Sequence, residues 1–170
     1  MISHWLPFLV FSVKVGALND RFDSRRLIQV GAACFMTASL AWGYFFATDS
    51  LEIPYAMAIL VLHGVAGVFW MTSSQVLLYS IVGPERLASA VRMNATARYL
   101  GVLVGPGIGS LMISLLGPTR GIFVNASLYL PLIVWLAFTK RGAKKPGAVA
   151  PARRTVRGFA DIIQTIKDVR

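Results

Sequence analysis

Long apolar segments with few or no charged residues recur along this chain. Each is near or above the roughly 20 residues that an α-helix needs to cross the hydrocarbon core of a bilayer. Charged residues make up 14% of the chain and hydrophobic residues 56%, whereas an average soluble domain has roughly 25% charged residues. The pattern predicts an all-α membrane protein, a helical bundle that sits in the lipid bilayer.

We expect five transmembrane helices followed by a tail. The spans are predicted at about residues 2–18, 27–48, 53–76, 94–116 and 121–139, and the tail at 140–170. The third span is expected to leave the hydrocarbon at the polar residues 72–75, where its helix continues at the interface as far as a turn at residues 83–86. The tail is predicted to begin as a basic linker rich in Gly, Ala and Pro, and to end in a short amphipathic helix.

Basic residues gather in alternate connecting segments. They follow the first, third and fifth spans: Arg21, Arg25 and Arg26; Arg86 and Arg92; Lys140, Arg141, Lys144 and Lys145. Because short basic loops stay in the cytoplasm, the tail is expected inside and the N-terminus outside a multi-pass protein of the bacterial inner (plasma) membrane. The first span then has no preceding segment, so we expect a further span upstream.

Several classes of function are disfavoured by composition. The net charge of +10 lies in these connecting segments rather than on an amphipathic domain, so we expect no nucleic-acid partner. Cys34 is the one cysteine and lies in an apolar run, where we interpret it as a packing residue. The chain has no phosphate-binding glycine loop with Lys, no paired acids inside a span and no cluster of metal ligands. We expect no catalytic residue, no metal and no cofactor.

The first connecting segment contains a motif. Residues 16–26 read G-A-L-N-D-R-F-D-S-R-R, which resembles the G-x-L-x-D-R-x-G-R-R signature between the second and third helices of the major facilitator superfamily. The match departs at Asp23, where that family usually has Gly. A generic basic loop explains the arginines but not Gly16, Leu18 and Asp20 together; Gly16 would allow close helix approach. The resemblance implies a latch that holds two halves of a transporter in the outward-open state, formed here by Gly16, Leu18, Asp20, Arg21, Arg25 and Arg26.

A second motif, G-V-L-V-G-P-G-I-G-S, begins at Gly101. It resembles the G-x-x-x-G-P-x-x-G-G pattern in the fifth helix of antiporters of the same superfamily and departs only at Ser110. Gly101, Gly105 and Gly109 lie four residues apart on one helix face and permit tight packing, while Pro106 removes a backbone hydrogen bond and bends the helix. Small residues at this spacing are weak evidence alone, but the two intervening spans are what the resemblance implies.

Together the motifs assign the five spans to the superfamily's helices two to six and the tail to its central cytoplasmic loop. Residues 84–90 and 94–109 look most like the enterobactin-exporter-like branch. The resemblance implies a secondary active exporter of a small molecule that works by alternating access with proton antiport, completed by a first helix and a C-terminal half that are absent here. The alternative is a non-transporting membrane protein, either a truncation or a scaffold that binds a partner.

Polar residues inside spans are the remaining candidates, because burying them in a bilayer is costly and usually has a reason. His63, near mid-membrane, could relay protons or be a hydrogen-bonded packing residue. Arg98, one turn after Asn94, could face the central cavity, pair with Asp20 or anchor the helix at the interface. Lys14 is interpreted as a residue that snorkels to the interface, with a role in transport as the alternative. Gln75 and Asn125 are interpreted as interhelical hydrogen-bond residues, with substrate binding as the alternative.

Overall fold

The structure, a computed structural model, describes the backbone of residues 2–139 and the side chains of residues 7–139. These residues form helices and no strand. The elements are α1 (Ile2–Arg21), α2 (Ser24–Ala47), α3 (Ile53–Leu116), α4 (Pro118–Ser127) and α5 (Tyr129–Phe138). The predicted all-α fold class is confirmed. The predicted linker and amphipathic helix of the tail lie outside the described residues.

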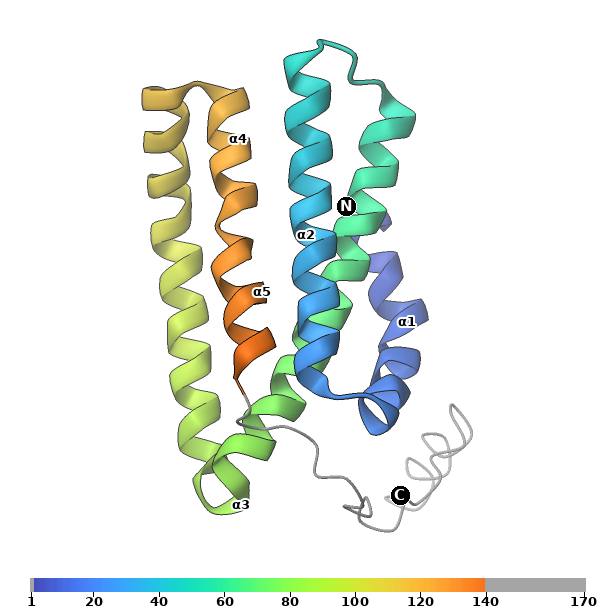
Figure 1. Cartoon of the computed structure of the whole chain (residues 1–170), viewed down its shortest axis with the longest axis vertical. Coiled ribbons are helices and arrows are strands. Elements are labelled where there is room, and N and C mark those ends of the chain that lie inside the picture. Colours follow the sequence, from blue (N-terminus) through green and yellow to red (C-terminus); the bar gives the residue numbers. More distant parts are fainter. Residues whose placement is uncertain (1, 140–170) are drawn as a thin grey trace, which may run out of the picture.

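Three helical segments among the described residues are long and apolar enough to cross a membrane: Ser24–Ala47, Ile53–Leu116 and Pro118–Phe138. The 64 residues of α3 would extend about 96 Å if straight, roughly three times the thickness of the hydrocarbon core. Figure 1 shows instead that α3 runs down, turns and returns as a separate arm. Two crossings by α3 together with α1, α2 and the α4–α5 segment would make up the five predicted spans, which stay a prediction.

Gly83 divides α3 into a first half, residues 53–82, and a second half, residues 84–116. Its φ of 72° and ψ of 176° lie in a region that glycine adopts without steric cost, and Pro84 suits the first position of the helix that follows. A break is therefore found at the start of the expected turn, residues 83–86. It is confined to one residue, because Gly83 alone leaves helical backbone angles within α3. The helix also continues through residues 72–75, where the Ser74 hydroxyl donates to the Met71 carbonyl at 3.2 Å.

Helix α2 lies at the centre of the bundle, between the first half of α3 and the α4–α5 pair (Figure 1). A Cβ added at Gly31 would lie 3.1 Å from both the Ala66 carbonyl oxygen and the Phe69 Cβ atom. The backbones of α2 and α3 therefore approach closely at Gly31, where a side chain could be added only if its neighbours moved. Between α1 and α3, a Cβ at Gly67 would meet the Phe8 ring at 3.0 Å.

The other side of α2 packs on α4 and α5. A Cβ added at Gly43 would lie 3.0 Å from the Phe123 ring, and the Phe35 ring stacks on Tyr129 with ring centroids 5.7 Å apart. Pro131 lacks the N–H that would bond one turn back, and the helix is interrupted at Leu128, between α4 and α5. The helical segment at the predicted last span therefore begins at Pro118 and consists of two short helices, while the bounds of the span itself stay a prediction.

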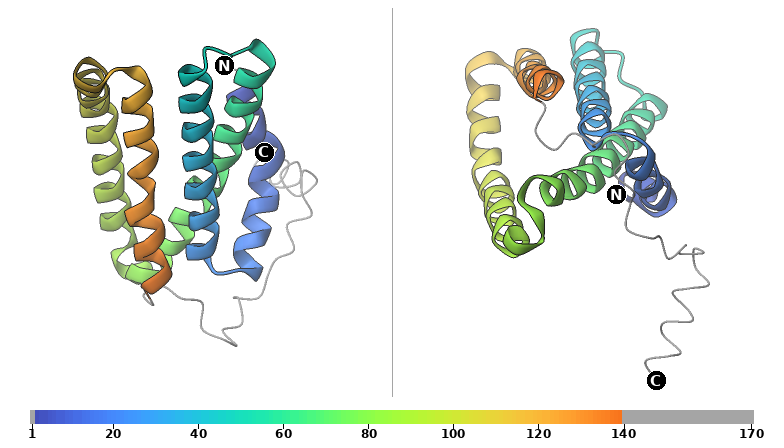
Figure 2. Two further views of the ribbon diagram at one scale, coloured as in Figure 1. Left: turned by 45° about the horizontal axis from the view of Figure 1, so that its top comes forward. Right: turned by 60° about the horizontal axis from the view of Figure 1, so that its bottom comes forward.

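The second half of α3 stands apart from the rest of the bundle (Figure 2, right). Its large apolar side chains are exposed around the whole helix, among them Leu103 at 78% and Leu115 at 74%. Near its end, Gly121 of α4 approaches the Met112 backbone and the Ile113 side chain. Among the described residues, this half of α3 thus has little tertiary packing apart from the turn into α4.

Candidate functional site: the loop of the first motif

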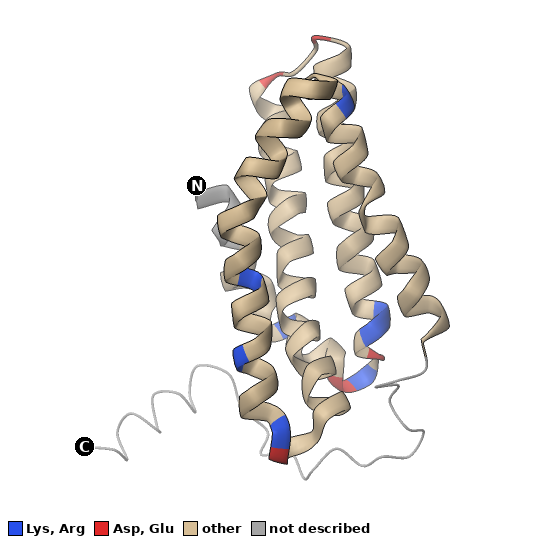
Figure 3. Cartoon of the chain, turned by 90° about the vertical axis from the view of Figure 1, so that its left-hand side faces the viewer, with Lys and Arg blue, Asp and Glu red and all other residues tan. Residues whose placement is uncertain are grey.

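Most of the charged residues on the helices and turns lie at one end of the bundle (Figure 3). That end holds the loop between α1 and α2, the turn at Gly83 and the end of α5. The opposite end holds the turn with Asp49 and Glu52 and the short α3–α4 connection near Arg120. Because basic loops stay cytoplasmic, the loop of the first motif is predicted to face the cytoplasm.

This orientation can be tested by thiol labelling of intact cells after Cys34 is replaced by Ala. A cysteine at Arg26 is expected to be shielded from an impermeant reagent added outside, and a cysteine at Ser50 to react, since both positions are exposed. Ser24 is unsuitable because it is only 8% exposed. A permeant reagent should label both variants. Labelling of Arg26→Cys but not of Ser50→Cys by the impermeant reagent would invert the orientation.

Asp23 is the N-cap residue of helix α2. Its backbone is extended, with φ −68° and ψ 124°, and its Oδ1 atom accepts a hydrogen bond from the Arg25 N–H at 2.9 Å. Asp is among the preferred N-cap residues because its carboxylate satisfies an N–H group that the first helical turn leaves without a partner. The negative charge also suits the positive end of the helix dipole. The departure from the superfamily signature at Asp23 therefore has a local structural role.

The Arg25 guanidinium is held between Asp23 and α5. Its Nε lies 3.1 Å from both carboxylate oxygens of Asp23 and its Nη2 2.6 Å from Oδ2. These are charge-assisted hydrogen bonds, which are stronger than bonds between neutral groups and fix the direction of the guanidinium. The remaining Nη1 donates to the carbonyl oxygen of Thr139, at the end of α5. The side chains of Arg25 and Asp23 are 17% and 16% exposed, so the pair is mostly covered.

Asn19 joins α1 to α3 just before the loop. Its Nδ2 donates to the Val15 carbonyl at 2.9 Å and to the Ser73 hydroxyl oxygen at 3.0 Å. Asn19 is 7% exposed and Ser73 is fully buried. The Asn19 Oδ1 atom has no hydrogen-bond partner among the described residues. Sequence reasoning treated Asn19 only as a variable position of the motif and did not identify Ser73.

The six residues proposed for the latch divide into groups. Asp20, Arg21 and Arg26 are exposed, whereas Arg25 is bound to Asp23 and Thr139. Apart from its own turn of helix, no described part of the chain would lie within 4 Å of a Cβ at Gly16, so the expected close helix approach is not found there. Leu18 is half-buried. Counted from Gly16, the signature also places Arg at position 24, so Ser24 is a second departure beside Asp23.

The second motif lies on the isolated half of α3. A Cβ added at Gly101, Gly105 or Gly109 would meet nothing within 4 Å among the described residues. Pro106 lies inside the helix, where the backbone angles remain helical. The packing partner expected for this glycine face is therefore not part of the described chain. The role of the second motif in helix packing stays a prediction.

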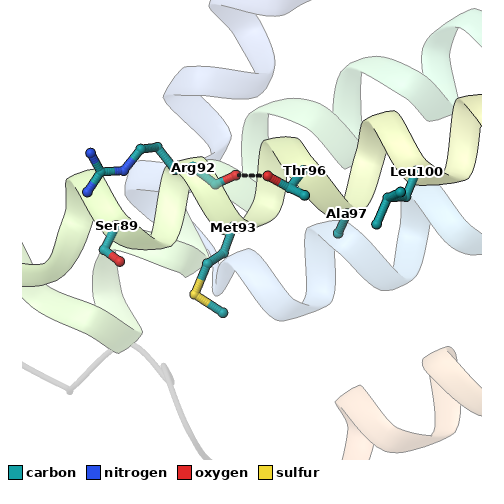
Figure 4. A pocket seen from close by; sticks show the side chains of 6 residues that line it. All are labelled: Ser89, Arg92, Met93, Thr96, Ala97 and Leu100. Carbon is teal, nitrogen blue, oxygen red and sulfur yellow. Dashed lines mark hydrogen bonds between the residues drawn. The ribbon is translucent and has the colours of Figure 1, made fainter.

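An open hollow of about 410 Å³ lies along residues 89–100 of the same half of α3 (Figure 4). It is lined by Ser89, Arg92, Met93, Thr96, Ala97 and Leu100. Asn94 and Arg98, the residues expected to line a cavity, are exposed but do not line this hollow. With 3.6 residues per turn they lie on the opposite face from Ser89 and Thr96. Figure 4 shows Arg92 reaching away from the helix at one end of the hollow.

The other polar candidates face neighbouring helices or the surface. The His63 ring meets the Phe35 ring of α2 edge-on, with centroids 4.7 Å apart. The Asn125 amide donates to the Ser39 hydroxyl at 3.1 Å, which confirms the prediction that it hydrogen-bonds between helices. The Lys14 amino group lies 5.6 Å from the centroid of the Phe11 ring. Gln75 is exposed.

Comparison with known proteins places these features in a family. A family model described as the Major Facilitator Superfamily matches residues 1–170. The Multidrug efflux pump Tap of Mycobacterium tuberculosis (strain ATCC 25618 / H37Rv) is 28% identical to this chain. The alignment is 178 residues long with its gaps and covers 97% of this chain and 41% of the relative. The Tetracenomycin C resistance and export protein of Streptomyces glaucescens is 28% identical over 132 residues, which cover 78% of this chain and 24% of the relative.

No solved structure matches the chain. The chain spans less than half the length of the two export proteins that it resembles. The family match over the whole chain, the helical fold and the long apolar helices agree with one another. The chain is an integral membrane protein that belongs to the major facilitator superfamily.

Proposed function

We propose that this chain forms helices two to six of a secondary active exporter of a small molecule. The observation that carries the proposal is the match to superfamily export proteins across 97% of the chain. The exposed second half of α3 supports it, because a substrate path between two halves requires one face of each half to meet the other. Family membership also favours a transporter over an enzyme.

In this proposal, transport proceeds by alternating access, the rocking of one half against the other around a central site. The latch would be formed by the exposed Asp20, Arg21 and Arg26, which lie at the predicted cytoplasmic end. Gly101, Gly105 and Gly109 would face helices that the described chain does not contain. Their open surroundings are consistent with such a contact.

Proton antiport is the coupling that the family resemblance implies. His63 is the titratable residue within the first half of α3 that could relay protons, although its contact with Phe35 also suits a packing role. Asn94 and Arg98 are proposed to face the central cavity of the complete transporter. The enterobactin-exporter-like branch and the bacterial inner membrane also belong to the proposal.

A non-transporting scaffold is the second candidate. The exposed apolar surface of the second half of α3 favours it as well, since a partner membrane protein could cover that surface. The two candidates differ in whether solute moves across the membrane when the missing helices are supplied.

Asp20→Asn tests the transport proposal in a transporter that contains residues 1–170 together with the helices that complete both halves. We expect the rate of efflux to fall at least about tenfold, while membrane insertion is unchanged. A tenfold lower rate corresponds to an activation free energy for transport that is higher by about 1.4 kcal/mol. The substitution removes the charge and keeps the shape, and Asp20 is exposed. Efflux of a fluorescent dye from cells measures the effect.

Asp49→Asn is the matched control, since it makes the same chemical change at an exposed position at the opposite end of the bundle. It should leave efflux close to the wild-type rate. Wild-type efflux by Asp20→Asn would remove the latch from the proposal, and equal losses in both variants would mean that the effect is not specific to the motif.

A further inference from the structure

We propose that residues 19–25 form a brace that ties the first half of α3 and the end of α5 to the loop of the first motif. One leg runs from Asn19 to Ser73 of α3, and the other from Asp23 and Arg25 to Thr139 of α5. The brace goes beyond the proposed function and does not depend on it, because it concerns how this chain holds its own helices together.

The leg to α5 binds a carbonyl at a helix terminus. Thr139 follows the last helical residue with φ −75° and ψ 126°, and its N–H bonds to the Trp135 carbonyl. The last carbonyl groups of a helix lack partners within it and carry partial negative charge, so a guanidinium there is favourable. Arg25 supplies that cation.

Asp23 fixes the direction of the Arg25 guanidinium. Because Nε and Nη2 are both engaged by the carboxylate, Nη1 is the edge left to reach Thr139. Glycine, which the superfamily usually has at this position, has no side chain to do this. The brace is therefore a property of this chain's departure from the signature rather than of the signature itself.

A second contact repeats the arrangement one turn further along α2. The Gln29 amide donates to the Ile133 carbonyl of α5 at 2.9 Å. Arg25 and Gln29 are four residues apart and so lie on the same face of α2. Two side chains of α2 thus hold the backbone of the second half of α5, one at Ile133 and one at Thr139.

The leg to α3 is buried. Asn19 and Ser73 lie in the contact between α1 and α3, where a hydrogen bond lost from one partner leaves the other without compensation. Only residues 20–22 separate the two legs. The exposed Asp20 and Arg21 are therefore held on a segment that is fixed at both ends, and the end of α5, where the tail begins, is fixed to the same segment.

Hydrogen–deuterium exchange of residues 1–170 in lipid nanodiscs tests the brace. Arg25→Gln should speed exchange in the last turn of α5 by about tenfold, the factor expected for loss of one charge-assisted hydrogen bond. Arg26→Gln is the matched control, because it removes the same charge from the neighbouring, exposed position. Peptides from α4 serve as the internal reference for intact folding.

Two further variants separate the parts of the brace. Asp23→Asn can still cap α2 but loses the ion pair, so exchange should rise at the end of α5 while the first turn of α2 stays protected. Asn19→Leu should speed exchange at the end of α1 and leave α5 unchanged, and Ser73→Ala added to it should have little further effect.

Unchanged exchange in α5 for Arg25→Gln, or equal increases for Arg25→Gln and Arg26→Gln, would overturn the brace. Unchanged exchange at the end of α1 in Asn19→Leu would overturn the leg of the brace that runs to α3. None of these measurements involves transport. A failure of the brace therefore leaves the proposed exporter untouched, and a failure of transport leaves the brace untouched.

Discussion

Gly31→Leu is expected to destabilise the bundle by about 3 kcal/mol, the upper part of the range for overpacking a tight contact. The Cβ atom of the new side chain would lie 3.1 Å from the Ala66 carbonyl oxygen and from the Phe69 Cβ atom. It would lie 3.2 Å from the backbone nitrogen of Trp70. These atoms belong to the backbone or to the base of a side chain in α3, so they cannot rotate away. The helices must separate, which also disturbs the contact of Phe35 with His63.

Unfolding of the purified chain in mild detergent, followed by tryptophan fluorescence during titration with SDS, measures the change. Gly101→Leu is the control, because it adds the same side chain to a helix at a position with no neighbour within 4 Å. It should be neutral, or stabilising by up to about 1 kcal/mol through helix propensity. Equal stability of the two variants would show that α2 and α3 are not in close contact at Gly31.

The helical class could be predicted from the sequence because the bilayer imposes a strong and simple pattern. Apolar runs of sufficient length have few alternatives to helices when every backbone polar group must be satisfied internally. The break after the third predicted span was also identifiable, because Gly83 and Pro84 are strong signals for a turn and Gly83 alone leaves helical angles within α3. The helix was expected to continue past the polar residues 72–75, and it does. The point at which it leaves the hydrocarbon stays a prediction, because a helix boundary does not show where the bilayer ends.

The loop of the first motif was identifiable from the sequence, but the contacts that its residues make were predictable only in part. The N-cap role of Asp23 follows a local rule, an acidic residue immediately before a helical segment, and sequence reasoning could have found it. No local pattern pairs Asn19 with Ser73, 54 residues away, or Arg25 with Thr139, 114 residues away. Such pairs depend on how helices pack, which hydropathy does not encode.

Residues 1–170 alone are expected to insert into a membrane and to give no transport above background. In superfamily transporters of this kind the substrate path lies between two halves that rock against each other. The described chain provides one group of helices, and the second half of α3 is exposed on all faces within it. Surfaces that should meet other helices, including the exposed Asn94 and Arg98, would contact lipid. The isolated chain should therefore also tend to self-associate.

Reconstitution in liposomes with a proton gradient and a panel of dyes and siderophores measures this. Flux from the isolated chain should equal that of empty liposomes, whereas co-reconstitution with a chain that carries the first helix and the C-terminal half should produce gradient-dependent flux. Flux from the isolated chain would contradict the expectation and mean that copies of the chain complete the path for one another. If neither preparation moves solute although both are folded and inserted, the result favours the non-transporting scaffold over the exporter. The helices needed for alternating access would then be present without transport.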